Sequence, residues 1–100
     1  MSSLSILQIG GSGFVSGTLA RTAIAAGHDV TVVTRGRREL PQGVRAITVD
    51  RTDRSAFADA IAADGRSFDL VVDCIPFSAD DAKQDIAVFR DRARHLVLIS

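Results

Sequence analysis

The chain has 100 residues and 46% of them are hydrophobic, which excludes a disordered chain and is enough for the core of one domain. Twelve basic residues balance twelve acidic ones, so the net charge of zero gives no overall attraction to nucleic acid or to an anionic membrane. No apolar run reaches the roughly 18 residues of a membrane span, and the N-terminus lacks the basic segment of a secretory signal. We therefore expect a cytoplasmic protein with neither nucleic-acid nor membrane partners.

Short runs rich in β-branched residues alternate with longer amphipathic segments, which predicts a layered α/β fold. Strands are expected at 4–9, 28–34, 44–49, 68–75 and 95–99, and helices at 14–26, 54–64 and from 80 or 81 to about 92. Several of these strands are nearly continuous apolar runs, as parallel strands covered on both faces are. The connection 35–43 is short for a parallel crossover, and an antiparallel pair is the alternative. The handedness rule for such crossovers favours the parallel arrangement.

The helix ends carry local signals of their own. Asp53 is a good N-cap for the second helix, and a glycine closes it at Gly65. Asp80 and Asp81 stand where the third helix begins, which favours capping and complementing the helix dipole over a catalytic carboxylate pair. The periodicity of the third helix predicts that its apolar stripe, including Ile86, is buried and that Asp85 faces water.

A glycine-rich segment at 10–17, with the sequence GGSGFVSG, joins the first strand to the first helix. Glycines at such a junction allow positive φ and close approach of a pyrophosphate, and the helix N-terminus stabilises its charge. The motif is close to G-x-x-G-x-x-G, with Ser16 in the third position. A tight turn without a ligand is the alternative, but the strand-turn-helix context favours a dinucleotide site. The residues of this turn expected at the cofactor are Gly10, Ser12, Gly13, Phe14 and Val15.

The end of the second strand bears on which dinucleotide is bound. Sites for NAD usually carry an acid here, whereas this strand ends at Thr34 and is followed by Arg35, Arg37 and Arg38. A guanidinium can bind the 2′-phosphate of NADP through two charge-assisted hydrogen bonds, and a carboxylate would repel it. The sequence therefore predicts NADP, with NAD less favoured, bound with the help of Thr34, Arg35 and Arg38. A solvated arginine loop is the alternative, and it is weakest for Arg35, nearest the strand.

With this turn, the pattern predicts a doubly wound, mostly parallel Rossmann-type sheet of about five strands in the order 3-2-1-4-5, with three helices. Over essentially its whole length the chain resembles the N-terminal half of the extended and atypical short-chain dehydrogenase/reductases, the NAD(P)-dependent epimerases and dehydratases. The resemblance rests on 10–15, 26–36, 49–51 and 69–75. It implies that Asp50 bonds the adenine amino group and that Arg51 lies beside the ring. It also implies that the path to the nicotinamide is lined by Cys74, Ile75, Pro76 and Ser100.

The same resemblance implies catalysis by a Tyr-x-x-x-Lys pair helped by a Ser or Thr after the fifth strand. The chain has no Tyr and one lysine, Lys83, so no catalytic residue is expected in it. We expect residues 1–100 to be the N-terminal NAD(P)-binding portion of a protein whose catalytic segment, substrate domain and small-molecule substrate lie outside this chain. An oxidoreductase or a sugar-nucleotide epimerase or dehydratase is favoured. A non-catalytic nucleotide-sensing or RNA-associated regulator is the alternative, and an oligomer stays open.

Other reactive residues suggest no second site. The one cysteine, Cys74, excludes a disulfide framework and a cysteine-based zinc site. At the end of an apolar strand it is expected to be a small buried hydrophobe instead of a redox thiol. His28 and His95 lack a matched ligand set, so no metal is expected. Asp73 either bonds backbone or sugar near the site or caps the strand edge.

Overall fold

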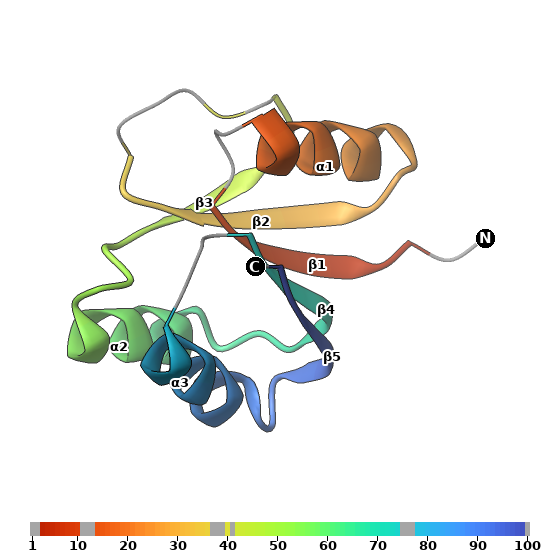
Figure 1. Cartoon of the computed structure of the whole chain (residues 1–100). Coiled ribbons are helices and arrows are strands. Elements are labelled where there is room, and N and C mark those ends of the chain that lie inside the picture. Colours follow the sequence, from red (N-terminus) through yellow and green to blue (C-terminus); the bar gives the residue numbers. More distant parts are fainter. Residues whose placement is uncertain (1–2, 11–13, 37–39, 41, 75–77, 100) are drawn as a thin grey trace.

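A computed structural model of the chain describes residues 3–10, 14–36, 40, 42–74 and 78–99. Strands and helices alternate along it except where β2 and β3 follow one another (Figure 1). In chain order the elements are β1 (Ser5–Ile9), α1 (Phe14–Ala25), β2 (Asp29–Thr34), β3 (Arg45–Thr48), α2 (Arg54–Asp64), β4 (Phe68–Asp73), α3 (Ala79–Phe89) and β5 (Ala93–Leu98). Each lies within a few residues of its expected position.

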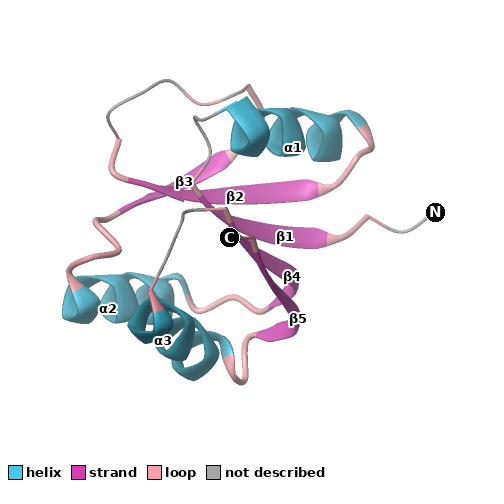
Figure 2. Cartoon of the chain, viewed as in Figure 1, coloured by secondary structure: helices cyan, strands magenta, loops and turns pink. Residues whose placement is uncertain are grey.

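The strands form one sheet in the order β3-β2-β1-β4-β5, and every pair in it is parallel. Helix α1 covers one face, while α2 and α3 cover the other (Figure 2). The predicted doubly wound α/β fold and its strand order are therefore confirmed. The short connection after β2 is a parallel crossover, because Thr31 pairs with Arg45 and Thr34 with Thr48.

The core lies in two layers because successive side chains of a strand point to opposite faces. Under α1, a small buried cluster consists of Ala20, Val30 and Val32. Under α2 and α3, a larger one consists of Leu7, Ile9, Val33, Phe57, Ile61, Phe68, Val71 and Phe89. None of the helices within the described residues combines the length and the apolar character that a membrane span needs.

Helix α3 begins slightly earlier than expected. Its N-cap is Ser78, whose hydroxyl accepts a hydrogen bond from the Asp81 amide at 3.3 Å, while the Asp81 carboxylate accepts one from the Ser78 amide at 3.1 Å. This reciprocal pair is a capping box. The prediction that Asp80 or Asp81 starts the helix is wrong by a residue or two, but both acids lie in its first turn, where they complement the dipole.

The buried face of α3 also differs from the predicted one. Ile86, expected in the core, is 58% exposed, whereas Asp85, expected in water, is fully buried. Phe89 is buried as predicted. The physical reason is a cation beneath the helix: Asp85 turns inward because it pairs with Arg51. Such a partner, 34 residues away in the sequence, is invisible to helical periodicity.

Helix α2 has both predicted ends. The Asp53 carboxylate accepts a hydrogen bond from the Ala56 amide at 3.1 Å, and Gly65 adopts φ 70° while its amide donates to the Ile61 carbonyl at 3.3 Å. The side chain satisfies one of the amide donors that a helix N-terminus leaves open. A glycine relieves the strain of the left-handed conformation at the other end.

Replacing Asp53 with alanine should therefore destabilise the fold by about 1 kcal/mol. Urea unfolding followed by circular dichroism measures the change. Asp59→Ala is the matched control, because Asp59 is an exposed carboxylate within the same helix. Equal losses in the two variants would argue against the capping role.

Candidate functional site

The carboxyl ends of β1, β2 and β4 lie side by side at one edge of the sheet. Their hydrogen bonds continue past the strands: the Gly10 amide donates to the Val33 carbonyl at 2.8 Å, and the Cys74 amide donates to the Ile9 carbonyl at 3.0 Å. From this edge β1 leads to α1 on one face, whereas β4 leads to α3 on the other (Figure 1). Open α/β sheets bind ligands at such a reversal of direction.

Gly10 stands at this reversal, just ahead of α1. Its φ of 84° lies in the left-handed region that glycine adopts without strain. The side chain of Gln8, which is 1% exposed, donates a hydrogen bond to the Gly10 carbonyl at 2.7 Å. Sequence reasoning missed Gln8, although a polar residue inside an apolar strand was a signal for it. A buried side chain thus fixes the orientation of the peptide that begins the glycine turn.

Several predicted site residues cannot be placed. Phe14 and Val15 open α1 as expected. The predicted cofactor residues Ser12, Gly13, Arg38, Ile75, Pro76 and Ser100 lie outside the described residues.

The end of β2 lies beside that of β1 at the same edge. The half-buried Thr34 hydroxyl accepts a hydrogen bond from the Gly36 amide at 3.2 Å, which bends the chain just after the strand. Gly36 has φ 79°, and a Cβ on it would lie 3.2 Å from the Thr48 methyl group, so glycine is suited to this bend. Arg35 is exposed. The geometry brings Thr34 and Arg35 to the edge that holds Gly10.

After β3 comes the Asp50–Arg51 pair. Asp50 is exposed, and its carboxylate accepts hydrogen bonds from the Thr52 amide at 2.9 Å and the Thr52 hydroxyl at 2.6 Å. These bonds hold the turn that leads to α2. They leave the predicted contact of Asp50 with adenine untested.

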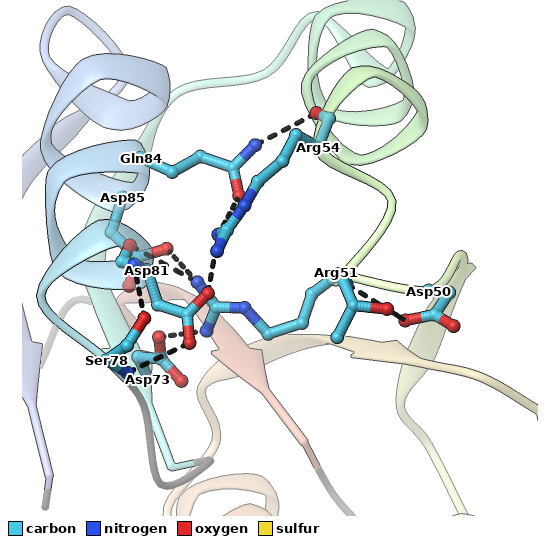
Figure 3. A network of polar contacts seen from close by, with 9 residues as sticks. Asp50, Arg51, Arg54, Asp73, Ser78, Asp81, Gln84 and Asp85 are labelled. Carbon is cyan, nitrogen blue, oxygen red and sulfur yellow. Dashed lines mark hydrogen bonds and ion pairs between the residues drawn. The ribbon is translucent and has the colours of Figure 1, made fainter.

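The Arg51 guanidinium, for which the resemblance implies a place beside the adenine, lies among buried carboxyl groups. Arg51 is only 5% exposed and points beneath the edge of the sheet, where it pairs with the carboxylate of Asp73 and with that of Asp85 at 2.9 Å (Figure 3). It also lies over the Phe57 ring, 5.4 Å from the centroid. Asp73 is fully buried and pairs with Arg51, so its carboxylate is part of this interior group.

This buried group holds two carboxyls against one guanidinium. Burial, together with the neighbouring Asp73, raises the pKa of Asp85 to about 8, and Arg51 only partly offsets the shift. Burial disfavours the charge of Arg51, but its hydrogen bond to Asp73 and the surrounding carboxylates raise its pKa overall. One oxygen of Asp85, Oδ2, is buried with no hydrogen-bond partner among the described residues. With its pKa raised in this way, the Asp85 carboxyl can keep a proton at neutral pH while it contacts the guanidinium.

The other reactive residues have ordinary surroundings. Burial and the charge of Asp73 raise the pKa of the half-buried Cys74 to about 11, so the thiol stays protonated at neutral pH. The His28 ring accepts a hydrogen bond from the Leu4 amide at 3.0 Å through Nδ1. Within the described part of the chain, no three His, Cys, Asp or Glu side chains gather as metal ligands would.

Residues 6–98 match the model of the NAD dependent epimerase/dehydratase family. The 2′-dehydrokanamycin reductase of Streptomyces kanamyceticus is 40% identical over 81 residues, which cover 79% of this chain and 22% of that protein. A Methylobacillus flagellatus structure assigned as a NAD-dependent epimerase/dehydratase has a TM-score of 0.77 at 23% identity, over 99% of this chain and 37% of its own. A Leptospira borgpetersenii short chain dehydrogenase with bound NAD⁺ has a TM-score of 0.66 at 14% identity, over 88% and 41%. The chain thus spans less than half the length of each.

Proposed function

Because the chain belongs to the NAD-dependent epimerase/dehydratase family, we propose that its carboxyl edge holds NADP in preference to NAD, as the cofactor-binding part of a reductase, epimerase or dehydratase. The observation that carries the proposal is the end of β2. A neutral Thr34 and an exposed Arg35 stand there beside Gly10. The residues present suit a dinucleotide whose ribose bears an extra phosphate.

The pyrophosphate would bind at the turn from β1 to α1. Gly10 has the positive φ that such turns require, and Gln8 holds its carbonyl. Helix α1 begins four residues later, and a helix N-terminus favours an anion through its dipole and its free amides. Ser12 and Gly13 stay sequence-based predictions for the same contact.

The 2′-phosphate would bind at Arg35, with Arg38 as a predicted second cation. Thr34 carries no charge to repel the phosphate, and its hydroxyl already accepts a hydrogen bond from the Gly36 amide. The tight bend at Gly36 follows Arg35 directly, at the edge where the adenosine end of the cofactor would lie. A guanidinium suits this task because it can donate two parallel hydrogen bonds to one phosphate.

When bound, the nicotinamide would exchange hydride with a small-molecule substrate. Reduction is favoured over epimerisation because the 40% identical relative is a reductase. We place proton transfer and substrate binding in residues beyond these 100, since Tyr is absent from them. The described residues would bind and orient the cofactor.

Isothermal titration with NADPH and NADH tests the proposal. The chain should bind NADPH more tightly, and Arg35→Ala should weaken NADPH binding about 10-fold to 100-fold, because a charge-assisted hydrogen bond contributes about 1.5–3 kcal/mol. NADH binding should change little, since NADH lacks the 2′-phosphate.

Arg45→Ala is the matched control for this measurement. Arg45 is also an exposed arginine, but it begins β3 at the opposite edge and pairs with Asp29 at 2.6 Å. Its replacement should leave both affinities unchanged. Equal affinity of the unmodified chain for NADPH and NADH would overturn the preference, and no binding of either would overturn the proposed function.

A further inference from the structure

We propose that Arg51 is a positioning residue of the dinucleotide site, which fixes the carboxyl edge of the sheet from beneath without touching the cofactor. The inference rests on the proposed function. It departs from the expectation that Arg51 lies beside the adenine. Its basis is the placement of one buried guanidinium between three segments that meet at this edge.

Arg51 and its two carboxyl partners belong to three different parts of the fold (Figure 3). Arg51 follows Asp50, just after β3. Asp73 is the last residue of β4 and directly precedes Cys74, whose amide bonds to β1. Asp85 lies in the middle of α3. One side chain therefore connects the ends of two strands to the helix that covers them.

The two strands are not neighbours in the sheet. Its order places both β2 and β1 between β3 and β4, so no direct ladder joins the residues after β3 to the end of β4. The Arg51 side chain makes this connection on the face covered by α2 and α3. Gly10 and Thr34 stand at the ends of the two intervening strands. The contact from Arg51 to Asp73 thus sets the spacing of an edge that also carries the proposed cofactor residues.

The group belongs to the core. Asp73 and Asp85 are fully buried, and Arg51 lies over Phe57, which is itself in the main hydrophobic cluster. A planar guanidinium donates hydrogen bonds in fixed directions to the oxygens of both carboxyl groups, which a lysine ammonium cannot do. Replacing Arg51 should therefore displace the edge even where the fold survives.

The chain contains a matched arginine at the opposite edge. Arg66 precedes β4, lies 5.5 Å from the centroid of the Phe68 ring, and pairs with Asp64 at 2.9 Å. It also donates a hydrogen bond to the Thr31 hydroxyl at 3.2 Å. Arg66 thus combines an aromatic contact with an ion pair, as Arg51 does, but at the amino edge, far from the proposed cofactor.

Arg51→Met and Arg66→Met in the full chain separate positioning from stability. Both should lower the midpoint of thermal unfolding. At a temperature where circular dichroism shows both variants folded, Arg51→Met should raise the dissociation constant for NADPH at least about tenfold, the lower end of the range known for residues that orient the ligands of a metal. Arg66→Met should leave it unchanged. If Arg51→Met does not fold, Arg51→Lys serves in its place, with Arg66→Lys as its control.

A second readout needs no ligand. In ¹H–¹⁵N NMR spectra, Arg51→Lys should shift the amide signals of Gly10, Thr34 and Cys74, whereas Arg66→Lys should not. Unchanged signals there, or an unchanged dissociation constant in a folded Arg51 variant, would overturn the positioning role. Equal weakening by the Arg66 variant would overturn it as well. The two ideas can fail separately. If the unmodified chain binds neither NADPH nor NADH, but the Arg51→Lys variant shows the expected shifts, the proposed function is overturned while the role of Arg51 in shaping the edge stands.

Discussion

Replacing Phe57 with alanine is expected to destabilise the fold by about 3–5 kcal/mol, a large share of the roughly 5–15 kcal/mol that stabilises a typical domain. Phe57 is completely buried in the cluster between the sheet and the helices α2 and α3. Its ring meets that of Phe89 edge to face at a centroid distance of 6.2 Å, and the Arg51 guanidinium covers it. Truncation therefore removes buried apolar area, an aromatic pair and the surface on which the buried cation rests.

Urea unfolding followed by circular dichroism measures this loss. Ile86→Ala is the contrasting variant, because Ile86 lies on α3 near the same cluster but is 58% exposed. It should change the free energy of unfolding by about 0.5 kcal/mol or less. Phe57→Leu should fall between the two, since leucine refills part of the cavity. A loss below about 1 kcal/mol for Phe57→Ala would contradict the packing of α2 described above.

The success of sequence reasoning on the fold has a physical cause. The apolar runs that form β1, β2 and β4 are buried on both faces, and such strands are recognisable without knowledge of their neighbours. The ends of α2 were equally clear, because Asp53 and Gly65 act on backbone groups three or four residues away. The strand order followed from the glycine turn and the alternation of strands and helices. Each of these signals is local in the sequence.

The failures come from contacts between distant residues. Arg51 lies 22 residues from Asp73 and 34 from Asp85, so helical periodicity could not indicate that these side chains meet in the core. Within the site, the carboxyl edge does bring Gly10, Thr34 and Arg35 together, while their contacts with a cofactor stay predictions. The signal that the sequence does offer is Asp73, a charged residue within an apolar strand, which indicates a buried partner of opposite charge.

Because Asp85 is buried beside Asp73, we expect the fold to lose stability as the pH rises from about 4 to about 8. In the folded chain, burial and Asp73 raise the pKa of Asp85 to about 8, whereas the unfolded chain loses this proton near 3.8. Between these values the folded state binds more protons than the unfolded state, so raising the pH favours unfolding. The stabilising contribution is complete below about 3.8 and is lost as the pH passes the folded pKa.

Urea unfolding at a series of pH values, with the unmodified chain and Asp85→Asn, measures this contribution. One proton limits the difference in slope to about 1.4 kcal/mol per pH unit. An asparagine keeps an oxygen acceptor for Arg51 but has no proton to lose, and Asp73 and Asp81, the other carboxylates near the guanidinium, are present in both proteins. The difference between the two profiles reports the effect of replacing the Asp85 carboxyl, and it should fall as the pH rises. Parallel profiles would mean that Asp85 is ionised throughout and that Arg51 alone balances both carboxylates.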